Sequence, residues 1–285
     1  TTYYLLPLEL SYTTLVGNQH HCDRCNALIL LKAIARSQRK LVPECYTFHD
    51  FHPIKANKMA KTRYLFISDL HLEPSRLHVS EAFRDYLRAL SEQDALFILG
   101  DLFEVWLGDD FIPPFLQPAI DALAALPVKK YLMHGNRDFL LGEEFCKLTG
   151  MTLLNDPTVI DLYGRPCLLM HGDSLCTKDV AYMEARKMLR DPDFQADFLT
   201  KTVEERIAFA SSAREQSKAH TGEMSTDIMD VTLSEVESAM SNAGVNLMIH
   251  GHTHRPATHA LMVNRKQATR IVLGDWDTSG WYITA

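Results

Sequence analysis

Short apolar runs alternate with segments of helical periodicity, and this alternation limits the possible folds more than any other feature. Residues 64–68, 95–99 and 130–134 are strand-length runs that are mostly apolar. Between them, residues 80–90 and 115–126 place apolar side chains at helical spacing. Strands that alternate with helices form a mainly parallel sheet with both faces covered, so the sequence predicts an α/β fold.

A long helical block interrupts this rhythm in the second half of the chain. Residues of about 178–242 are charged, lack strand runs and are typical of several helices. We therefore expect a helical cap inserted into the core fold at about 178–242. Strand patterns flank the block, at 159–162 and 167–171 before it and at 245–250, 258–263, 270–273 and 281–284 after it.

Residues 1–58 do not share the pattern of the rest of the chain. We interpret them as an extraneous or disordered leader, with the folded domain at 59–285, because a clean strand pattern begins soon after Met59. A small zinc module is the alternative, held by Cys22, Cys25, Cys45 and His49.

The composition limits the cellular location and the classes of binding partner that we expect. The formal net charge of −7 argues against general nucleic-acid binding. No apolar stretch approaches the roughly 18 residues of a spanning helix, and no secretory leader is evident. The 6 Cys residues of a chain of 285 do not suggest a disulfide scaffold, so we expect free thiols in the cytoplasm.

Polar clusters follow the strand runs, each at the carboxyl end of a run. In open α/β sheets such positions meet at one rim, where ligands bind. Carboxylate and amide oxygens mixed with imidazole nitrogens suit Mn²⁺, Fe²⁺ or Zn²⁺. The clusters supply Asp69, His71, Asp101, Asn136, Arg137, His171, His252 and His254.

A pair of cations would need a shared anionic ligand, and Asp101 has the central place in the set. The clusters therefore predict a metal site at this rim, with Asp101 as the ligand that two cations would share.

The ordered clusters resemble the calcineurin-like metallophosphoesterase superfamily over residues 63 to about 275. The resemblance implies an α/β sandwich of two packed sheets with a dinuclear site that hydrolyses a phosphate bond. Two cations about 3.5–4 Å apart would stabilise a hydroxide nucleophile and bind the phosphoryl oxygens. Arg137 would neutralise the charge that develops on the phosphoryl group. It implies that one metal is bound by Asp69, His71, Asp101 and His254, and the other by Asp101, Asn136, His171 and His252. His250 adjoins this motif, and we interpret it as structural.

Two departures from the broad superfamily pattern are shared with the UDP-2,3-diacylglucosamine hydrolases of lipid A biosynthesis. Arg137 stands where many members have His, and Glu104 where many have Asp. Residues 100–110, 134–142 and 250–256 also resemble this family. The resemblance implies hydrolysis of UDP-2,3-diacylglucosamine to 2,3-diacylglucosamine 1-phosphate and UMP, with two Mn²⁺ per chain.

Substrate contacts carried over from the resemblance fall on Asn136, Arg137, Asp179, Ser217 and His252. The catalytic set is Asp101, Asn136, Arg137 and His252. Thr221 and Met224 depart from the family pattern, which puts part of the head-group binding in doubt. Members of the family also run beyond the position of Ala285, which implies a further strand.

The predicted cap also has apolar side chains that could line an acyl groove, although for any single one of them packing between the cap helices is the better explanation. These are Met183, Met188, Leu189, Phe194, Phe198, Leu199, Ile207 and Phe209. Basic cap residues predict a solvated face, or alternatively attraction to anionic lipid headgroups. They are Lys178, Arg186, Lys187, Arg190, Lys201 and Arg206.

We therefore expect a peripheral protein on the cytoplasmic face of the inner membrane, with a lipid-linked sugar nucleotide as substrate and no protein partner evident. Two other functions are weighed against this one. A soluble nucleotide or phosphoprotein phosphatase of the same superfamily is disfavoured by Arg137 and by the long cap. A non-catalytic metal-binding scaffold is disfavoured because no metal ligand is missing from the set.

Overall fold

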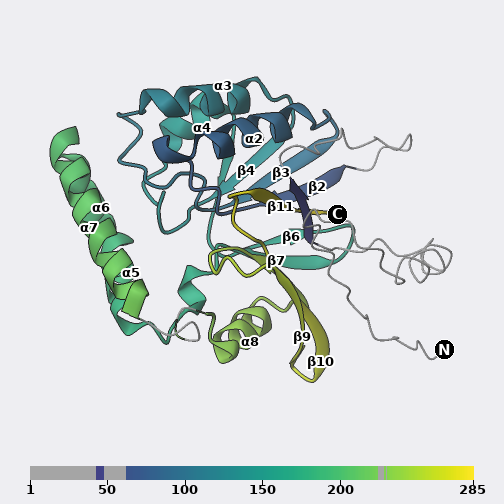
Figure 1. Cartoon of the computed structure of the whole chain (residues 1–285). Coiled ribbons are helices and arrows are strands. Elements are labelled where there is room, and N and C mark those ends of the chain that lie inside the picture. The colour runs from purple at the N-terminus through teal and green to yellow at the C-terminus, as the bar shows by residue number, and fades with distance from the viewer. Residues whose placement is uncertain (1–42, 48–61, 224–227, 229) are drawn as a thin grey trace, which may run out of the picture. The chain divides into compact units, whose positions relative to one another are not determined.

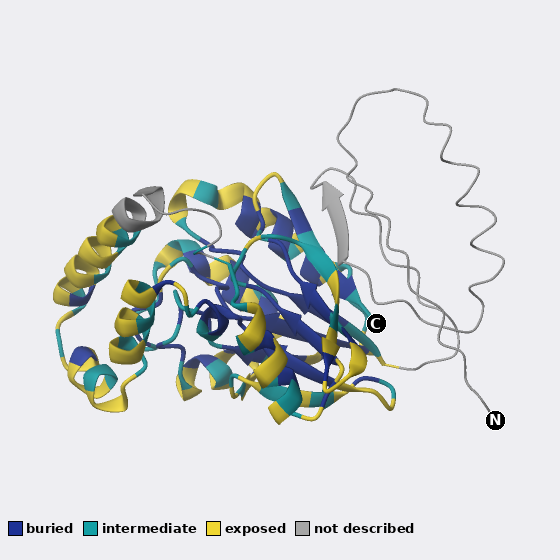
Figure 2. Cartoon of the chain, turned by 90° about the horizontal axis from the view of Figure 1, so that it is seen from below, coloured by how far each residue is buried: buried dark blue, intermediate teal, exposed yellow. Residues whose placement is uncertain are grey.

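The computed structural model describes residues 43–47, 62–223, 228 and 230–285 (Figure 1). Two β-sheets form the centre of this part of the chain, and helices pack on them. Buried residues gather in the sheets, whereas the helices of the predicted cap are largely exposed (Figure 2). The predicted α/β fold of two sheets with a helical cap is confirmed.

The first sheet contains the strands predicted from the first three apolar runs. Its order is β1-β11-β2-β3-β4-β5, with β2 to β5 parallel and β11 antiparallel to β2. Parallel strands place the loops after their carboxyl ends side by side. The strands are β1 (Pro43–Thr47), β2 (Arg63–Ile67), β3 (Asp94–Leu99), β4 (Lys129–Met133), β5 (Thr152–Leu154) and β11 (Ser279–Thr284).

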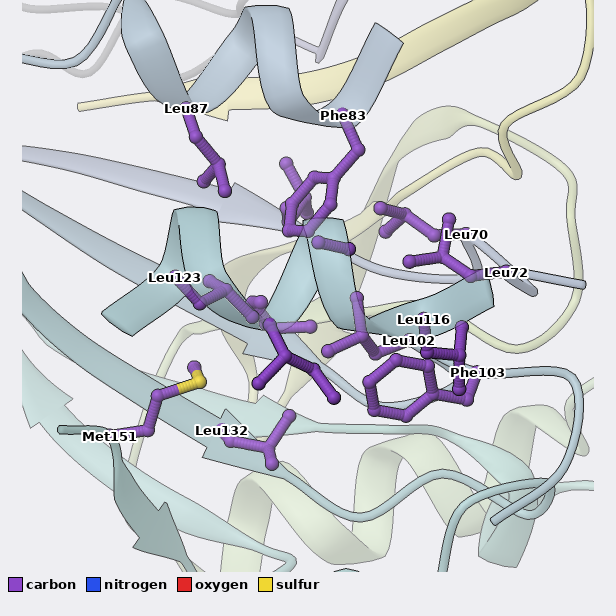
Figure 3. Packing of buried hydrophobic residues seen from close by; sticks show 14 of the residues in the cluster. Leu70, Leu72, Phe83, Leu87, Leu102, Phe103, Leu116, Leu123, Leu132 and Met151 are labelled. Atoms are coloured by element: carbon purple, nitrogen blue, oxygen red, sulfur yellow. The ribbon is translucent and has the colours of Figure 1, made fainter. Parts of the chain in front are cut away.

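Helices α2 (Leu77–Arg88), α3 (Gln117–Ala125) and α4 (Glu143–Thr149) cover one face of this sheet. Side chains alternate along β2, so Leu65 packs beneath these helices while Phe66 stacks on Phe97 on the opposite face, with ring centroids 5.0 Å apart. Figure 3 shows the resulting core, with Phe83 of α2 above Leu132 of β4. This packing fixes the strand ends from which the polar clusters project.

The second sheet has the order β6-β7-β8-β10-β9, and β7, β8 and β10 run parallel. β6 and β7 pair antiparallel and form a hairpin, with Gly164 in the turn between them. Helix α8 (Leu233–Asn242) packs Val236 and Met240 against Met248 of this sheet. The strands are β6 (Thr158–Asp161), β7 (Pro166–Met170), β8 (Leu247–His250), β9 (Ala257–Val263) and β10 (Lys266–Val272).

The remaining helices of the predicted insertion are α5 (Val180–Leu189), α6 (Pro192–Leu199) and α7 (Val203–Glu223). They project to one side of the core (Figure 1). Phe198 is only 4% exposed and packs with Phe194 and Phe209, so it serves packing rather than an open groove. Phe209, at 37% exposed, remains accessible.

None of the helices in the described residues has the length and apolar character needed to cross a bilayer.

One of the basic cap residues is buried, contrary to prediction, and two others are half-buried. Arg206 is 2% exposed and donates to Asp110 at 2.7 Å and to the carbonyl oxygen of Leu107 at 2.6 Å. Arg186 and Arg190 also point inward, toward Asp173. Charge alone does not reveal burial, because a long side chain can reach a partner beneath the surface. These three arginines therefore contact groups of the core, and Arg206 is not available to lipid headgroups.

The sequence did not predict α4 and β5, which are both short, or β1. β1 lies within residues 1–58 and pairs antiparallel with β11. The other residues of that segment, including Cys22, Cys25 and His49 of the alternative zinc module, lie outside the described residues. The domain boundary at residue 59 therefore stays a prediction. Cys146 and Cys167 are free thiols.

The burial of Arg206 predicts that it stabilises the cap. Replacing it, as Arg206→Met, removes charged hydrogen bonds worth about 1–3 kcal/mol. We expect the melting temperature to fall by several degrees and hydrogen exchange to rise in α5 to α7. Lys201→Gln is the matched control, because its ion pair with Asp197 lies on the surface of the cap. Equal behaviour of the two variants would show that Arg206 is not an anchor.

Candidate metal centre

The predicted site residues meet at the carboxyl ends of the central strands. Asp69 and His71 follow β2, and Asp101 follows β3. Asn136 follows β4 at the same edge. The loops after β7 and β8 in the second sheet bring His171, His252 and His254 to this edge. Segments far apart in the sequence are thereby joined into one site.

The first group consists of Asp69, His71 and His254, whose donor atoms lie within 4.8 Å of one another. Nε2 of His71 lies 3.2 Å from Nε2 of His254. Nε2 of His254 lies 3.4 Å from Oδ1 of Asp69. Asp69 is fully buried, and its two oxygens accept from the backbone N–H of His252 at 3.1 and 2.9 Å.

The second group consists of Asp101, His171 and His252, again with donor atoms within 4.8 Å. Oδ1 of Asn136 lies 3.0 Å from Nε2 of His171 and 2.8 Å from Nδ1 of His252, so the amide joins this group. Nδ1 of His171 lies 2.9 Å from the carbonyl oxygen of Leu99. A proton on Nδ1 would be held there, which leaves Nε2 free to face the group.

Asp101 lies between the two groups. Its Oδ2 is 3.6 Å from Nε2 of His71 in the first group and 3.7 Å from Nε2 of His171 in the second. Its Oδ1 accepts from the backbone N–H of Arg137 at 2.9 Å. A Cβ atom at Gly135 would clash with this carboxylate, so a residue without a side chain is required there.

Several candidate ligands have left-handed backbone conformations, which are uncommon for residues other than glycine. Asp69, His71, Asp101, His252 and His254 have φ between 48° and 67°. Each such residue is strained by about 1–3 kcal/mol unless its surroundings impose the conformation. Here neighbouring loops do so, for example through the hydrogen bond from the N–H of His71 to the carbonyl of Asp101 at 3.0 Å.

The donor set fits divalent cations. Ligands about 2.0–2.2 Å from a metal lie roughly 3–3.5 Å from each other, and the separations within each group are of this size. The donors are carboxylate, amide and imidazole, without thiolate, which suits Mn²⁺, Fe²⁺ or Zn²⁺. The nearby Cys167 and Cys176 point elsewhere, and burial raises the pKa of each thiol to about 12.

Electrostatics also favours added positive charge at this site. Burial opposes a charge on His171, but Asp101, Asp173 and Asp69 raise its pKa to about 9. Burial and the charge of Asp101 raise the pKa of Asp138 to about 6. The buried carboxylates thus draw protons onto their neighbours, which is the behaviour expected of a site built to balance them with cations.

Three supporting residues were not given roles from the sequence. Asp138 accepts from the N–H groups of Gly135 and Leu102 at 2.8 Å each, and so ties two ligand loops together. Asp173 forms an ion pair with Arg186 at 2.8 Å. Glu104 lies with Oε2 3.0 Å from Nδ1 of His71. Their positions within the motifs were the only signal in the sequence for these three residues. Their roles could not be predicted, because each role depends on a partner distant in sequence.

The pKa of the Glu104 carboxyl lies below its ordinary value. Burial opposes its ionisation, but the contact with His71 and the charges of Arg137, His71 and Arg214 outweigh that effect. Glu104 is therefore a stable anion beside the site. Arg137 is half-buried near it, and its guanidinium makes no hydrogen bond to another described residue.

The predicted substrate contacts lie in different places around the two groups. Asp179 is 6% exposed and caps α5 by accepting from the N–H of Tyr182 at 2.9 Å. Ser217 is half-buried on α7, in the cap. The side chain of Thr221 and the whole of Met224 lie outside the described residues. His250 is fully buried, and burial and Arg270 lower its pKa to about 3, in keeping with a structural histidine.

The sequence model of the calcineurin-like phosphoesterase family matches residues 62–256. A UDP-2,3-diacylglucosamine hydrolase of Stenotrophomonas maltophilia is 49% identical over 76% of this chain and 96% of its own length. Proteins of the same name from Cellvibrio japonicus and Pseudomonas paraeruginosa are 50% and 51% identical. They align with 78% and 76% of this chain, and with 94% and 92% of their own lengths.

The position of Asp101 predicts that both groups depend on it. Asp101→Ala should lower the amount of Mn²⁺ bound at both sites and reduce hydrolysis more than about 100-fold. The reason is that loss of a ligand shared by two cations has a larger effect than loss of a residue that only contacts a ligand. Metal content by mass spectrometry and steady-state rates measure this. Asp121→Asn is the control, since Asp121 pairs with Gln117 on the exposed face of α3. Normal metal content and turnover in Asp101→Ala would refute the prediction.

Proposed function

This chain belongs to the calcineurin-like phosphoesterase family, in the group of UDP-2,3-diacylglucosamine hydrolases, and we propose that it hydrolyses the pyrophosphate bond of UDP-2,3-diacylglucosamine. The products are 2,3-diacylglucosamine 1-phosphate and UMP, and the reaction belongs to lipid A biosynthesis. The observation that carries the proposal is the arrangement of two ligand groups around Asp101, in a chain about half identical to relatives of that name.

Two Mn²⁺ ions are the proposed cofactors. Asp69, His71, Asp101 and His254 would hold one, while Asn136, His171 and His252 would hold the other together with Asp101. When bound, a cation pair lowers the pKa of water and neutralises phosphoryl oxygens. The mixed oxygen and nitrogen donors support a metal of the Mn²⁺ class.

The other proposed roles belong to side chains around these groups. Arg137 binds the phosphoryl group, because its half-buried guanidinium has no hydrogen bond to another described residue and its planar donors match phosphoryl oxygens. Asn136 and His252 contact both metal and substrate. Asp179, the N-cap of α5, and Ser217 on α7 contact the substrate from the cap.

A peripheral location on the cytoplasmic face of the inner membrane is part of the proposal. A diacyl substrate resides in a membrane, and exposed apolar residues on the cap, such as Val180 and Met188, support contact with a lipid surface. Arg206 is buried and takes no part in this contact. Of the basic residues predicted to attract lipid, Lys178 and Lys187 are exposed.

Oxygen-18 water distinguishes this reaction from the rival functions. With Mn²⁺, turnover of the diacyl sugar nucleotide should give UMP and the sugar phosphate. Each substrate molecule hydrolysed should place one labelled oxygen in one of these two products. Mass spectrometry identifies both products and locates the label. Release of inorganic phosphate, with preference for a mononucleotide or phosphopeptide, would instead indicate a soluble phosphatase. Metal binding without turnover of any of these would indicate a scaffold.

The cap is proposed to select acylated substrates, with the core supplying the chemistry. Phe209→Asp should raise the Michaelis constant for the diacyl substrate about tenfold or more, since burial of each methylene contributes about 0.8 kcal/mol. Hydrolysis of a small chromogenic phosphodiester should change little. Leu77→Asp is the control, because Leu77 is an exposed residue of the core helix α2.

Phe198 is unsuitable for this test because its burial predicts general unfolding of the cap. A parallel loss of both activities in a folded Phe209→Asp protein would show that the cap supports the site itself. That result would reject the proposed division between cap and core.

A further inference from the structure

A line of charged side chains leads from the cap to one of the candidate metal ligands. Arg214 lies on α7, with Nη2 3.1 Å from Oε2 of Glu73 and Nη1 3.3 Å from Oε1 of Glu104. The second oxygen of Glu104, Oε2, lies 3.0 Å from Nδ1 of His71. One carboxylate therefore contacts both a cap guanidinium and a ligand imidazole.

The backbone and side chain of Glu104 are held in place, so its carboxylate can orient the imidazole of His71. Its backbone N–H donates to the carbonyl of Leu72 at 3.2 Å, next to the bridge that pairs Leu72 with Phe103. Its side chain is 12% exposed, so solvent competes little for the carboxylate oxygens. Because Leu72 adjoins His71, the same short pairing fixes the spacing between the carboxylate and the imidazole.

His71 has one ring nitrogen directed toward the centre and one directed away. Nε2 faces Oδ2 of Asp101 at 3.6 Å and Nε2 of His254 at 3.2 Å. Nδ1 is buried and forms no well-aligned hydrogen bond within the described residues, and the close carboxylate of Glu104 is its ion-pair neighbour. For Nε2 to offer a lone pair to a cation, the proton must reside on Nδ1, and a carboxylate there favours that tautomer.

Two of the other ligand histidines, His171 and His254, are oriented by groups of the core. Nδ1 of His171 faces the backbone carbonyl of Leu99, at the end of a core strand. Nδ1 of His254 lies 3.7 Å from Asp275, which follows β10. His71 differs from both of them because the group behind it also contacts α7. Its orientation is therefore linked to the position of the cap.

We propose that Glu104 is a positioning residue that holds His71 in the tautomer and orientation that bind a divalent cation, and that Arg214 makes this hold depend on the cap. The inference rests on the proposed metal centre. Docking of α7 places Arg214 against Glu104, which keeps the carboxylate turned toward Nδ1. Loss of that contact leaves the carboxylate free to rotate, and the first ligand group weakens while the second is unaffected.

Four variants test the relay: Glu104→Gln, Arg214→Gln, the two combined, and Glu73→Gln as matched control. Glu73 contacts the same arginine, but no contact joins it to His71. Nitrogen-15 NMR of the metal-free protein reports the tautomer of His71, with its signal assigned by its loss in His71→Gln. Titration with Mn²⁺, followed by electron paramagnetic resonance of the free ion, reports the affinity of each site.

We expect Glu104→Gln to shift His71 from the Nδ1–H form toward a mixture and to weaken one Mn²⁺ site about 10- to 100-fold, as outer contacts of metal ligands typically do. The other site should keep its affinity. Arg214→Gln should act in the same direction but less strongly. The double variant should be no weaker than Glu104→Gln, because both act along one path. Glu73→Gln should stay within about twofold of the parent protein.

An unchanged tautomer and unchanged affinity in Glu104→Gln would overturn the positioning role. Independent, additive effects of Arg214→Gln and Glu104→Gln would overturn the link to the cap. Failure of the parent protein to bind Mn²⁺ would instead count against the proposed metal centre. The tautomer is measured without metal, so it decides the role of Glu104 toward His71 in either case.

Discussion

The placement of the Asp101 carboxylate is the constraint on which both halves of the site depend. One oxygen is held by the N–H of Arg137 at 2.9 Å, and the other lies 3.6 and 3.7 Å from His71 and His171. This position requires a residue without a side chain at Gly135. The relative positions of the ends of β3, β4 and β7 are therefore tightly constrained. The packing of the two sheets thus determines the geometry of the site.

Buried carboxylates near this point fall into two kinds. Asp173 is balanced within the protein, since Arg186 lies 2.8 Å away and Tyr182 donates to it at 3.0 Å. Neither Asp69 nor Asp101 pairs with a Lys or Arg of the described residues; beside them lie histidines, backbone N–H groups and, for Asp69, the hydroxyl of Ser68. Uncompensated buried charge is costly, and such groups either take up protons or bind cations. The first kind of carboxylate stabilises the fold, and the second is suited to cations.

The sequence was sufficient for the features that depend on local pattern. The strand runs and the polar residues at their ends follow from periodicity and chain order, and the structure brings Asp69 and His254 together as expected. Features that depend on distant partners were not accessible. The basic cap residues looked solvated because burial of Arg206 depends on Asp110 in another loop. The left-handed backbone of His71 likewise results from contacts between loops, which no residue pattern encodes.

The cap is attached largely through charged contacts to the loops around the site. Arg190 of the α5 end donates to the carbonyl of Gly135 at 2.8 Å, Arg206 binds Asp110, and Arg214 lies against Glu104. Directional contacts of this kind fix orientation as well as position. Apolar contact adds to them, since Phe198 belongs to the same buried cluster as Phe103 and Trp106 of the core. An insertion anchored on ligand loops can alter substrate choice without any change in the ligands. Its position and the geometry of the site therefore cannot vary independently.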